Sequence, residues 1–324
     1  MDIDSLIRKN IRGLKPYSSA RDEFQGEAQI YLDANENPNP SAYNRYPDPL
    51  QRELKKMIGG LKQIHSNNIF LGNGSDEVID LLFRAFCEPG IDNVLIPEPT
   101  YGMYAVSASV NNVPMLSVSF TPNFEIEPKV ILAAATPNTK LLFLCSPNNP
   151  SGNLLSRESI FEIIQSFNGL VVIDEAYIDF ANQESYIPSL INYPNLVILQ
   201  TLSKAWGLAA IRLGMCFASE QIVGVLNKIK PPYNISLLTQ QVAMQELQQV
   251  SKKEKWVQEI IAERTKLLFA LPSLSLVEHV YPSDANFLLV RIKNAKEVYR
   301  RLISQGIVVR DRSSVVLCEN CLRI

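Results

Sequence analysis

Histidine and cysteine are scarce in this 324-residue chain, which contains two histidines and five cysteines. His65 and His279 stand alone, and no second cysteine pair accompanies Cys318 and Cys321 at the spacing of a zinc site. We therefore expect no metal. The odd number of cysteines, scattered among apolar segments, is typical of free thiols in a reducing compartment and predicts a cytoplasmic protein.

Net charge and long apolar runs are also lacking. The 31 basic and 33 acidic residues give a formal charge of -2, without the basic excess of proteins that bind nucleic acids or anionic membranes. No apolar run reaches the roughly 18 residues of a membrane span. The first residues, "MDIDSLIRKNIRGLKPY", lack the apolar stretch of a signal peptide. These absences favour small molecules as ligands, with neither nucleic acid nor membrane as a partner.

What the chain has is apolar material, at 46% of its residues, arranged as strands that alternate with helices. The strands are apolar throughout and rich in valine, isoleucine and leucine, which is typical of a mostly parallel sheet covered on both faces. We expect strands at 68–71, 93–96, 140–145, 169–173 and 195–200, and helices at 48–60, 78–87, up to 110 and at 157–167. The fold class is therefore α/β.

The pattern changes twice along the chain. Residues 1–45 are polar and rich in asparagine and proline, and we expect an arm that packs with a smaller domain or a partner subunit. Residues 46–238 form the predicted large domain. Residues 239–324 form a predicted smaller α+β domain, which begins with one or two long amphipathic helices up to 271. A strand at 285–292, a helix at 295–306 and a strand at 307–310 complete this domain.

Polar motifs follow five of the expected strands, namely "GNGSDE", "PEPTY", "SPNNP", "DEAY" and "TLSK". In open α/β sheets ligands bind beyond the carboxyl ends of the strands. Each motif alone also has a structural explanation. Ser75 can cap a helix, Asp174 can form a salt bridge and Asn149 suits a turn. Tyr101 and Tyr177 are more often packing residues, and a lone lysine such as Lys204 is more often solvated.

Together the motifs describe a site for pyridoxal phosphate. This cofactor needs an amine for a Schiff base, a carboxylate at its ring nitrogen, donors to its ring oxygen and a cup for its phosphate. Lys204 supplies the amine and Asp174 the carboxylate. The donors to the ring oxygen are Asn149 and Tyr177, Tyr101 can pack on the ring, and the cup comprises Gly74, Ser75, Asp76, Thr201, Ser203 and Arg212.

The stretches "LDANENP", "RYPDP", "PTYGMY", "SPNNPSG", "DEAYIDF", "TLSKAWGLAAIRLG" and "CLRI" resemble the histidinol-phosphate aminotransferase family over nearly the whole chain. The resemblance implies an aspartate aminotransferase-like fold of type I. It implies that Lys204 carries the cofactor and then moves a proton at the substrate Cα. It also implies a homodimer, in which Tyr46 reaches the cofactor phosphate of the neighbouring subunit.

On the substrate side, the resemblance implies that Arg310 and Arg323 bind the phosphate of L-histidinol phosphate and then the carboxylate of glutamate. It adds contacts from Tyr17 and Tyr101, with Asn35 at the entrance. The family continues beyond "CLRI" with a strand and a helix, so we expect the penultimate residue Arg323 to fray. A related aromatic aminotransferase, a threonine-phosphate decarboxylase and a non-catalytic binding or regulatory protein remain alternatives.

Overall fold

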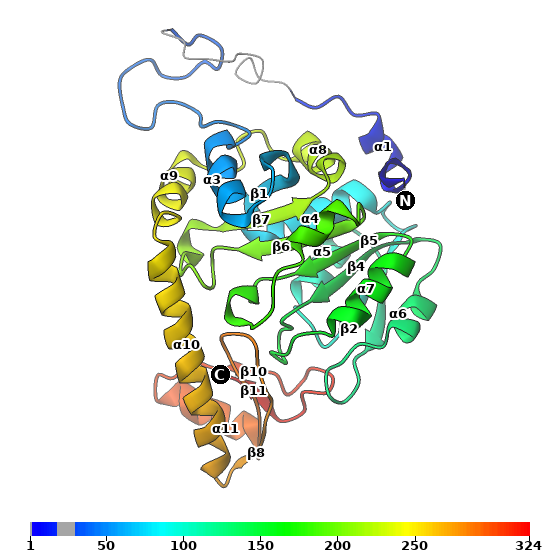
Figure 1. Cartoon of the computed structure of the whole chain (residues 1–324), viewed down its shortest axis with the longest axis vertical. Coiled ribbons are helices and arrows are strands. Elements are labelled where there is room, and N and C mark those ends of the chain that lie inside the picture. Colours follow the sequence, from blue (N-terminus) through cyan, green and yellow to red (C-terminus); the bar gives the residue numbers. More distant parts are fainter. Residues whose placement is uncertain (1, 18–29) are drawn as a thin grey trace.

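The computed structural model describes residues 2–17 and 30–324, which form a large α/β unit and a smaller α+β unit (Figure 1). In Figure 1 the long helix α10 descends from the large unit to the smaller one, where the C-terminus also lies. The expected α/β fold class is confirmed.

The large unit is built on a seven-stranded sheet of order β1-β7-β6-β5-β4-β2-β3. Only β7 runs against its neighbours, β1 and β6, so the remaining strands all end at one edge. The sequence did not lead us to expect β3 or β7. The strands are β1 Ile69–Asn73, β2 Asn93–Glu98, β3 Met115–Ser119, β4 Thr139–Cys145, β5 Leu170–Asp174, β6 Leu196–Thr201 and β7 Leu213–Ala218.

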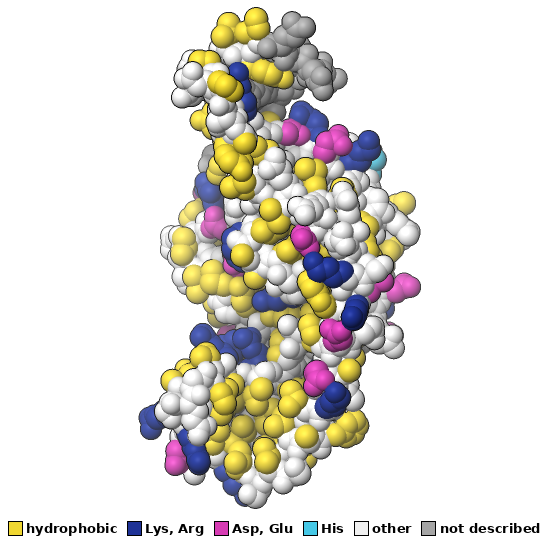
Figure 2. Space-filling model, turned by 90° about the vertical axis from the view of Figure 1, so that its left-hand side faces the viewer, with side chains coloured by type: hydrophobic (Ala, Val, Ile, Leu, Met, Phe, Trp, Pro, Cys, Tyr) yellow, Lys and Arg dark blue, Asp and Glu magenta, His cyan; other side chains and the backbone are white. Residues whose placement is uncertain are grey.

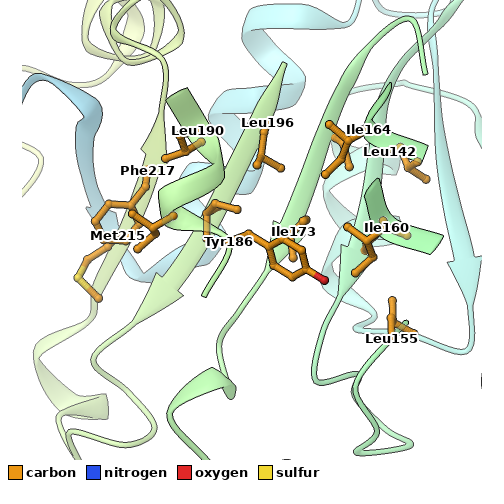
Figure 3. Packing of buried hydrophobic residues seen from close by; sticks show 14 of the residues in the cluster. Leu142, Leu155, Ile160, Ile164, Ile173, Tyr186, Leu190, Leu196, Met215 and Phe217 are labelled. Atoms are coloured by element: carbon orange, nitrogen blue, oxygen red, sulfur yellow. The ribbon is translucent and has the colours of Figure 1, made fainter. Parts of the chain in front are cut away.

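Helices cover both faces of this sheet, which explains why its strands are apolar throughout. Along β4, Leu141 and Phe143 belong to one buried cluster, whereas Leu142 and Leu144 belong to the other. Figure 3 shows part of the second cluster, in which Leu142 packs with strand and helix residues such as Ile160. The helices are α3 Arg52–Lys62, α4 Gly74–Phe86, α5 Met103–Val110, α6 Pro128–Ala134, α7 Arg157–Ser166 and α8 Glu220–Ile229.

The first of these helices differs from the expected one at both ends. Asp48 lies before α3 and accepts hydrogen bonds from the backbone N–H groups of Leu50 and Arg52, so it acts as a cap. The expected stop at Gly59 and Gly60 was wrong, because α3 continues to Lys62. A Cβ on Gly59 would lie 2.6 Å from the carbonyl oxygen of Ile64, so this glycine permits a close backbone contact.

The smaller unit contains a four-stranded antiparallel sheet of order β10-β11-β9-β8. The region expected to hold one or two helices up to 271 forms two, the second of which ends at Ala270, and the strand expected at 307–310 is only the two-residue strand at 310–311. Its elements are α9 Leu237–Glu246, α10 Val250–Ala270, β8 Val277–Val280, β9 Leu289–Ile292, α11 Ala295–Ser304, β10 Arg310–Asp311 and β11 Cys321–Arg323. Short 3-10 turns η2 Ser66–Asn68, η3 Ile178–Phe180, η4 Ile187–Ile191, η5 Ala209–Ile211 and η6 Leu271–Ser273 join other elements.

The start of the chain corrects the expected packing of the arm. The turn η1 Ile3–Leu6 and the short helix α1 Lys9–Arg12 lie on the large unit. Ile3, Leu6 and Ile7 are buried in the cluster that contains residues of α4 and α8, because these side chains are apolar despite the polar surroundings. Residues 18–29 of the arm lie outside the described residues. Among the described residues, no helix is long and apolar enough to cross a bilayer, and no group of three potential metal ligands occurs.

Candidate active site

A cleft of about 160 Å³ lies at the carboxyl ends of the strands, and all five polar motifs contribute to it. In Figure 2 a hollow separates the two lobes of the molecule, and lysine and arginine side chains gather beside it. The residues that line the cleft are Gly74, Ser75, Asp76, Tyr101, Cys145, Asn149, Asp174, Ala176, Tyr177, Thr201, Ser203, Lys204, Ala209 and Arg212. The expected convergence of these motifs is therefore present in the fold.

Asp174 is the last residue of β5 and is only 2% exposed. Its Oδ2 accepts a hydrogen bond of 2.7 Å from the Tyr104 hydroxyl, and its Oδ1 accepts one of 3.0 Å from the Ala176 N–H. Burial raises the pKa of Asp174 to about 6, although both hydrogen bonds act in the opposite direction. A nearby cation would stabilise the ionised form of this buried carboxylate. Our sequence reasoning missed Tyr104, whose only signal is its position one helical turn after Tyr101.

Lys204 follows β6 in a turn and faces the same cleft. Its Nζ lies 5.6 Å from the centre of the Tyr177 ring. Burial lowers the pKa of the Lys204 amine, the charge of Arg323 lowers it further, and Asp174 opposes both effects. A lowered pKa increases the fraction of neutral amine, which is the form that can act as nucleophile or base. The amine is therefore suited to covalent chemistry.

An anion cup is formed by the start of α4 and by the end of the loop that comes before β7. Gly74 has φ +72° and donates its N–H to the carbonyl of Arg212 at 2.7 Å. A Cβ on Gly74 would lie 2.7 Å from Arg212 Nη2, so the glycine leaves room for the guanidinium. Ser75 and Asp76 occupy the first turn of α4, where free N–H groups and the helix dipole favour an anion. Ser203 completes the polar rim through its 3.0 Å contact with the Thr201 hydroxyl.

Asn149 connects the two units across the cleft. Its Nδ2 donates to the Tyr177 hydroxyl at 3.3 Å, and its Oδ1 accepts from Arg323 Nη1 at 2.5 Å. Arg323 lies in β11, where it is paired with Leu289 on one side and Arg310 on the other. The expectation that Arg323 would fray was therefore wrong, because two neighbouring strands and a side-chain hydrogen bond hold it.

Tyr101 also lines the cleft. Its hydroxyl donates to Asp76 Oδ1 at 3.0 Å, and its ring packs edge-on against Tyr104 at a centroid distance of 5.5 Å. Asp76 in turn lies 3.8 Å from Arg212 Nη2. These contacts give one cleft an amine, a buried carboxylate, an anion cup and an aromatic wall.

Comparison with known proteins agrees with this geometry. The family described as "Aminotransferase class I and II" matches residues 24–324. The chain belongs to this family. It is 54% identical to the histidinol-phosphate aminotransferase of Cytophaga hutchinsonii, over 99% of this chain and 94% of that protein.

Solved structures share the fold of this aminotransferase. The histidinol-phosphate aminotransferase of Clostridium acetobutylicum matches with a TM-score of 0.79 and 25% identity, over 86% of this chain and 84% of that one. The enzyme of Sinorhizobium meliloti, solved with pyridoxal-5'-phosphate, also has a TM-score of 0.79, at 24% identity over 86% of this chain and 77% of that one. The expected type I aminotransferase fold is thereby confirmed.

The residues of the cleft fit pyridoxal phosphate, the cofactor of this aminotransferase family. The buried Asp174 carboxylate suits a protonated ring nitrogen, and the Arg212 guanidinium beside Gly74, at the start of α4, suits a phosphate group. Asn149 and Tyr177 present donors near the Lys204 amine. When bound, the cofactor supplies an electron sink for the bonds at the substrate Cα.

Five predicted site residues of the aminotransferase are not among those that line the cleft. Arg310 and Arg323 belong to the strand pair β10–β11, and Tyr17, Asn35 and Tyr46 border other hollows. Tyr17 is 71% exposed and borders a separate surface hollow, so its expected substrate contact is not present within one chain. Asn35 and Tyr46 border another hollow of about 390 Å³, which corrects the expected place of Asn35 for a single chain. The Tyr46 ring stacks on that of Tyr233 at 4.4 Å. The expected role of Tyr46 concerns the neighbouring subunit and stays a prediction.

Proposed function

We propose that this aminotransferase converts L-histidinol phosphate and 2-oxoglutarate into imidazole acetol phosphate and L-glutamate, a step of histidine biosynthesis. The observation that carries the proposal is that the partly desolvated Lys204 amine lies in one cleft with the buried Asp174 carboxylate. Arg323 lies beside this cleft and has no acidic partner among the described residues. The 54% identity to a protein of that name supports the choice of substrate.

Each side chain has a defined task in this proposal. Lys204 would hold the cofactor covalently and, once the substrate amine has replaced it there, its free Nζ would take the proton from the substrate Cα, for which its lowered pKa is an advantage. Asp174 would hold the proton on the ring nitrogen, and Tyr104 orients the carboxylate. Asn149 and Tyr177 would donate to the ring oxygen. The cup of Gly74, Ser75, Asp76, Thr201, Ser203 and Arg212 would hold the cofactor phosphate, and Tyr101 would pack on the ring; all of these residues line the cleft.

Arg323 and Arg310 form the substrate-anion site. The two residues face each other across the β10–β11 pair, and Arg323 already contacts Asn149. A guanidinium binds phosphate and carboxylate alike through paired N–H donors. One site can therefore serve histidinol phosphate in the first half-reaction and glutamate in the reverse of the second.

The test is a single-turnover measurement of the cofactor spectrum. Mixing the purified enzyme with L-histidinol phosphate should change the absorbance, and adding 2-oxoglutarate should reverse the change and yield one glutamate per site. A faster change with phenylalanine would favour an aromatic aminotransferase. Carbon dioxide release from threonine phosphate would favour a decarboxylase, and no change with any amine would favour a binding protein.

We also propose that the enzyme works as a homodimer, with Tyr46 completing the site of the partner chain and Tyr17 and Asn35 lying beside that site. Support comes from the exposure of Tyr17 and from the place of Tyr46 outside its own cleft. Mixing Lys204→Ala with Tyr46→Phe under subunit exchange tests this arrangement. If Tyr46 acts across the dimer, hybrid dimers regain one intact site. If it acts within its own chain, mixing restores nothing.

We retain two further proposals on organisation. The division into an arm at 1–45, a large domain at 46–238 and a small domain at 239–324 is supported by the separate sheets of the two units. A cytoplasmic location is supported by the five cysteines, which are all free and buried. Fractionation of cells that express the protein tests the location.

A further inference from the structure

A third arginine, Arg312, lies on the same sheet face as Arg310 and Arg323. In the antiparallel register Arg310 is opposite Arg323, and the N–H of Arg312 donates to the Cys321 carbonyl at 2.9 Å. Because side chains alternate along a strand, residues two positions apart share a face. Arg312 therefore follows Arg310 on one side of this strand pair.

This face is turned toward the cleft. Arg323 reaches Asn149 from it, at 2.5 Å. The opposite face carries Leu322 and Val290, which are buried in the core of the smaller unit. The charge of Tyr177, which lines the cleft, raises the pKa of Arg312, as expected if Arg312 is on the face that is turned toward the cleft.

The three guanidinium groups form no salt bridge with any described residue. Among the described residues, no carboxylate lies within 4 Å of Arg310, Arg312 or Arg323. Arg312 Nε is buried without a hydrogen-bond partner among the described residues, as is Arg291 Nε on the neighbouring strand, although Arg291 also donates through Nη2 to the Leu317 carbonyl. Burial lowers the pKa of Arg312, and the charges of Arg323 and Arg310 lower it further. Clustered cations with an unpaired buried donor are unfavourable alone and are stabilised by an anion.

The two kinds of anion that this site could bind differ in charge. A phosphate monoester carries about two negative charges above its second pKa of about 6, whereas a carboxylate carries one. We propose that Arg312 is a third cationic group of the substrate-anion site and makes it prefer a dianionic phosphate monoester over a carboxylate. This inference rests on the proposed function, since it specifies how the same site ranks its two substrates.

The experiment compares Arg312→Gln with the parent enzyme in half-reactions with L-histidinol phosphate and with L-glutamate. We expect kcat/KM for the phosphate substrate to fall roughly 10- to 100-fold and that for glutamate to fall less than about 3-fold, because removing one guanidinium affects the dianion most. In the parent the ratio of the two values should rise as pH passes about 6, and in the variant this rise should be weaker. Arg300→Gln, on the exposed side of α11, is the matched control and should change neither value.

Inorganic phosphate gives a second readout that does not need histidinol phosphate as a substrate. Its inhibition of the glutamate half-reaction should weaken in Arg312→Gln, while inhibition by acetate should not change. Arg312→Met keeps the apolar stem and replaces Arg312→Gln if that variant fails to fold. Equal losses for both substrates, or unchanged phosphate inhibition, would overturn the proposal. A different result is that the parent enzyme does not react with histidinol phosphate and yet shows phosphate inhibition that Arg312→Gln weakens. That result would refute only the proposed substrate.

Discussion

The hydroxyl of Tyr104 lies 2.7 Å from Oδ2 of Asp174, and both side chains are buried. Tyr104 comes from α5, and Asp174 ends β5, so the contact fixes the carboxylate relative to a helix on the sheet. The Tyr104 ring also stacks on Phe143 of β4 at 4.7 Å, which limits its movement. Donation to the ionised carboxylate lowers its pKa and thereby partly offsets the effect of burial.

Replacing Tyr104 with phenylalanine should weaken cofactor binding. The change leaves the ring in place and removes the donor, which we expect to raise the dissociation constant of pyridoxal phosphate roughly 5- to 30-fold, or about 1–2 kcal/mol. Fluorescence titration of the cofactor-free protein measures this constant. Tyr186→Phe is the matched control, because the Tyr186 hydroxyl is buried without a hydrogen-bond partner among the described residues. Equal weakening by both changes would contradict a specific role for the Tyr104 hydroxyl.

Asp174 should make the stability of the cofactor-free protein depend on pH. Its pKa of about 6 in the folded chain exceeds the ordinary 3.8, so the folded state binds the proton more tightly. The resulting stabilisation is present below about pH 4 and is lost as pH rises through 6. Asp174→Asn has no carboxyl group that titrates here, so it does not lose this stabilisation. Between pH 4 and 7 its free energy of unfolding should therefore rise by up to about 3 kcal/mol relative to that of the parent. Urea unfolding at several pH values measures the difference, and a constant difference would contradict it.

A methyl group at Gly74 should disturb the phosphate cup. In Gly74→Ala the new Cβ lies 2.7 Å from Arg212 Nη2, and the residue keeps a positive φ that costs about 1 kcal/mol. We expect the affinity for pyridoxal phosphate to fall by about 10-fold, with a smaller effect on pyridoxal, which lacks the phosphate. Gly102→Ala is the control, since nothing lies within 4 Å of its Cβ position. Equal losses for both ligands would place the damage outside the cup.

Lys204→Ala should abolish covalent attachment of the cofactor. After borohydride treatment, intact-mass measurement should find the cofactor joined to the parent protein and absent from the variant. Turnover should fall by about 10²- to 10⁴-fold or more, since the same amine acts as nucleophile and base. Lys252→Ala, on the exposed side of α10, serves as the control and should retain both properties. Cofactor that remains attached to the variant would identify another lysine as the reactive one.

Much of the fold was predictable because the strands of the large sheet have an unusually uniform composition. β4, β5 and β6 are buried on both faces, and their apolar runs end at Cys145, Asp174 and Thr201. The antiparallel strand β7 was missed, although it too is buried, because "LGMCFA" follows the Lys204 motif with only a short 3-10 turn between them. Its presence matters for the site, since it returns the chain so that Arg212 meets Gly74.

The sequence by itself determined which groups are candidates for the chemistry of the cleft, because Lys204, Asp174 and Asn149 each lie at or after the end of a strand that local composition marks. Only the tertiary structure decided which groups tune that chemistry. Tyr104 and Arg312 lie far from Asp174 and Asn149 along the chain, and no local pattern distinguishes them from packing or surface residues. Their roles arise from burial and strand register, which depend on contacts between distant segments rather than on neighbouring residues.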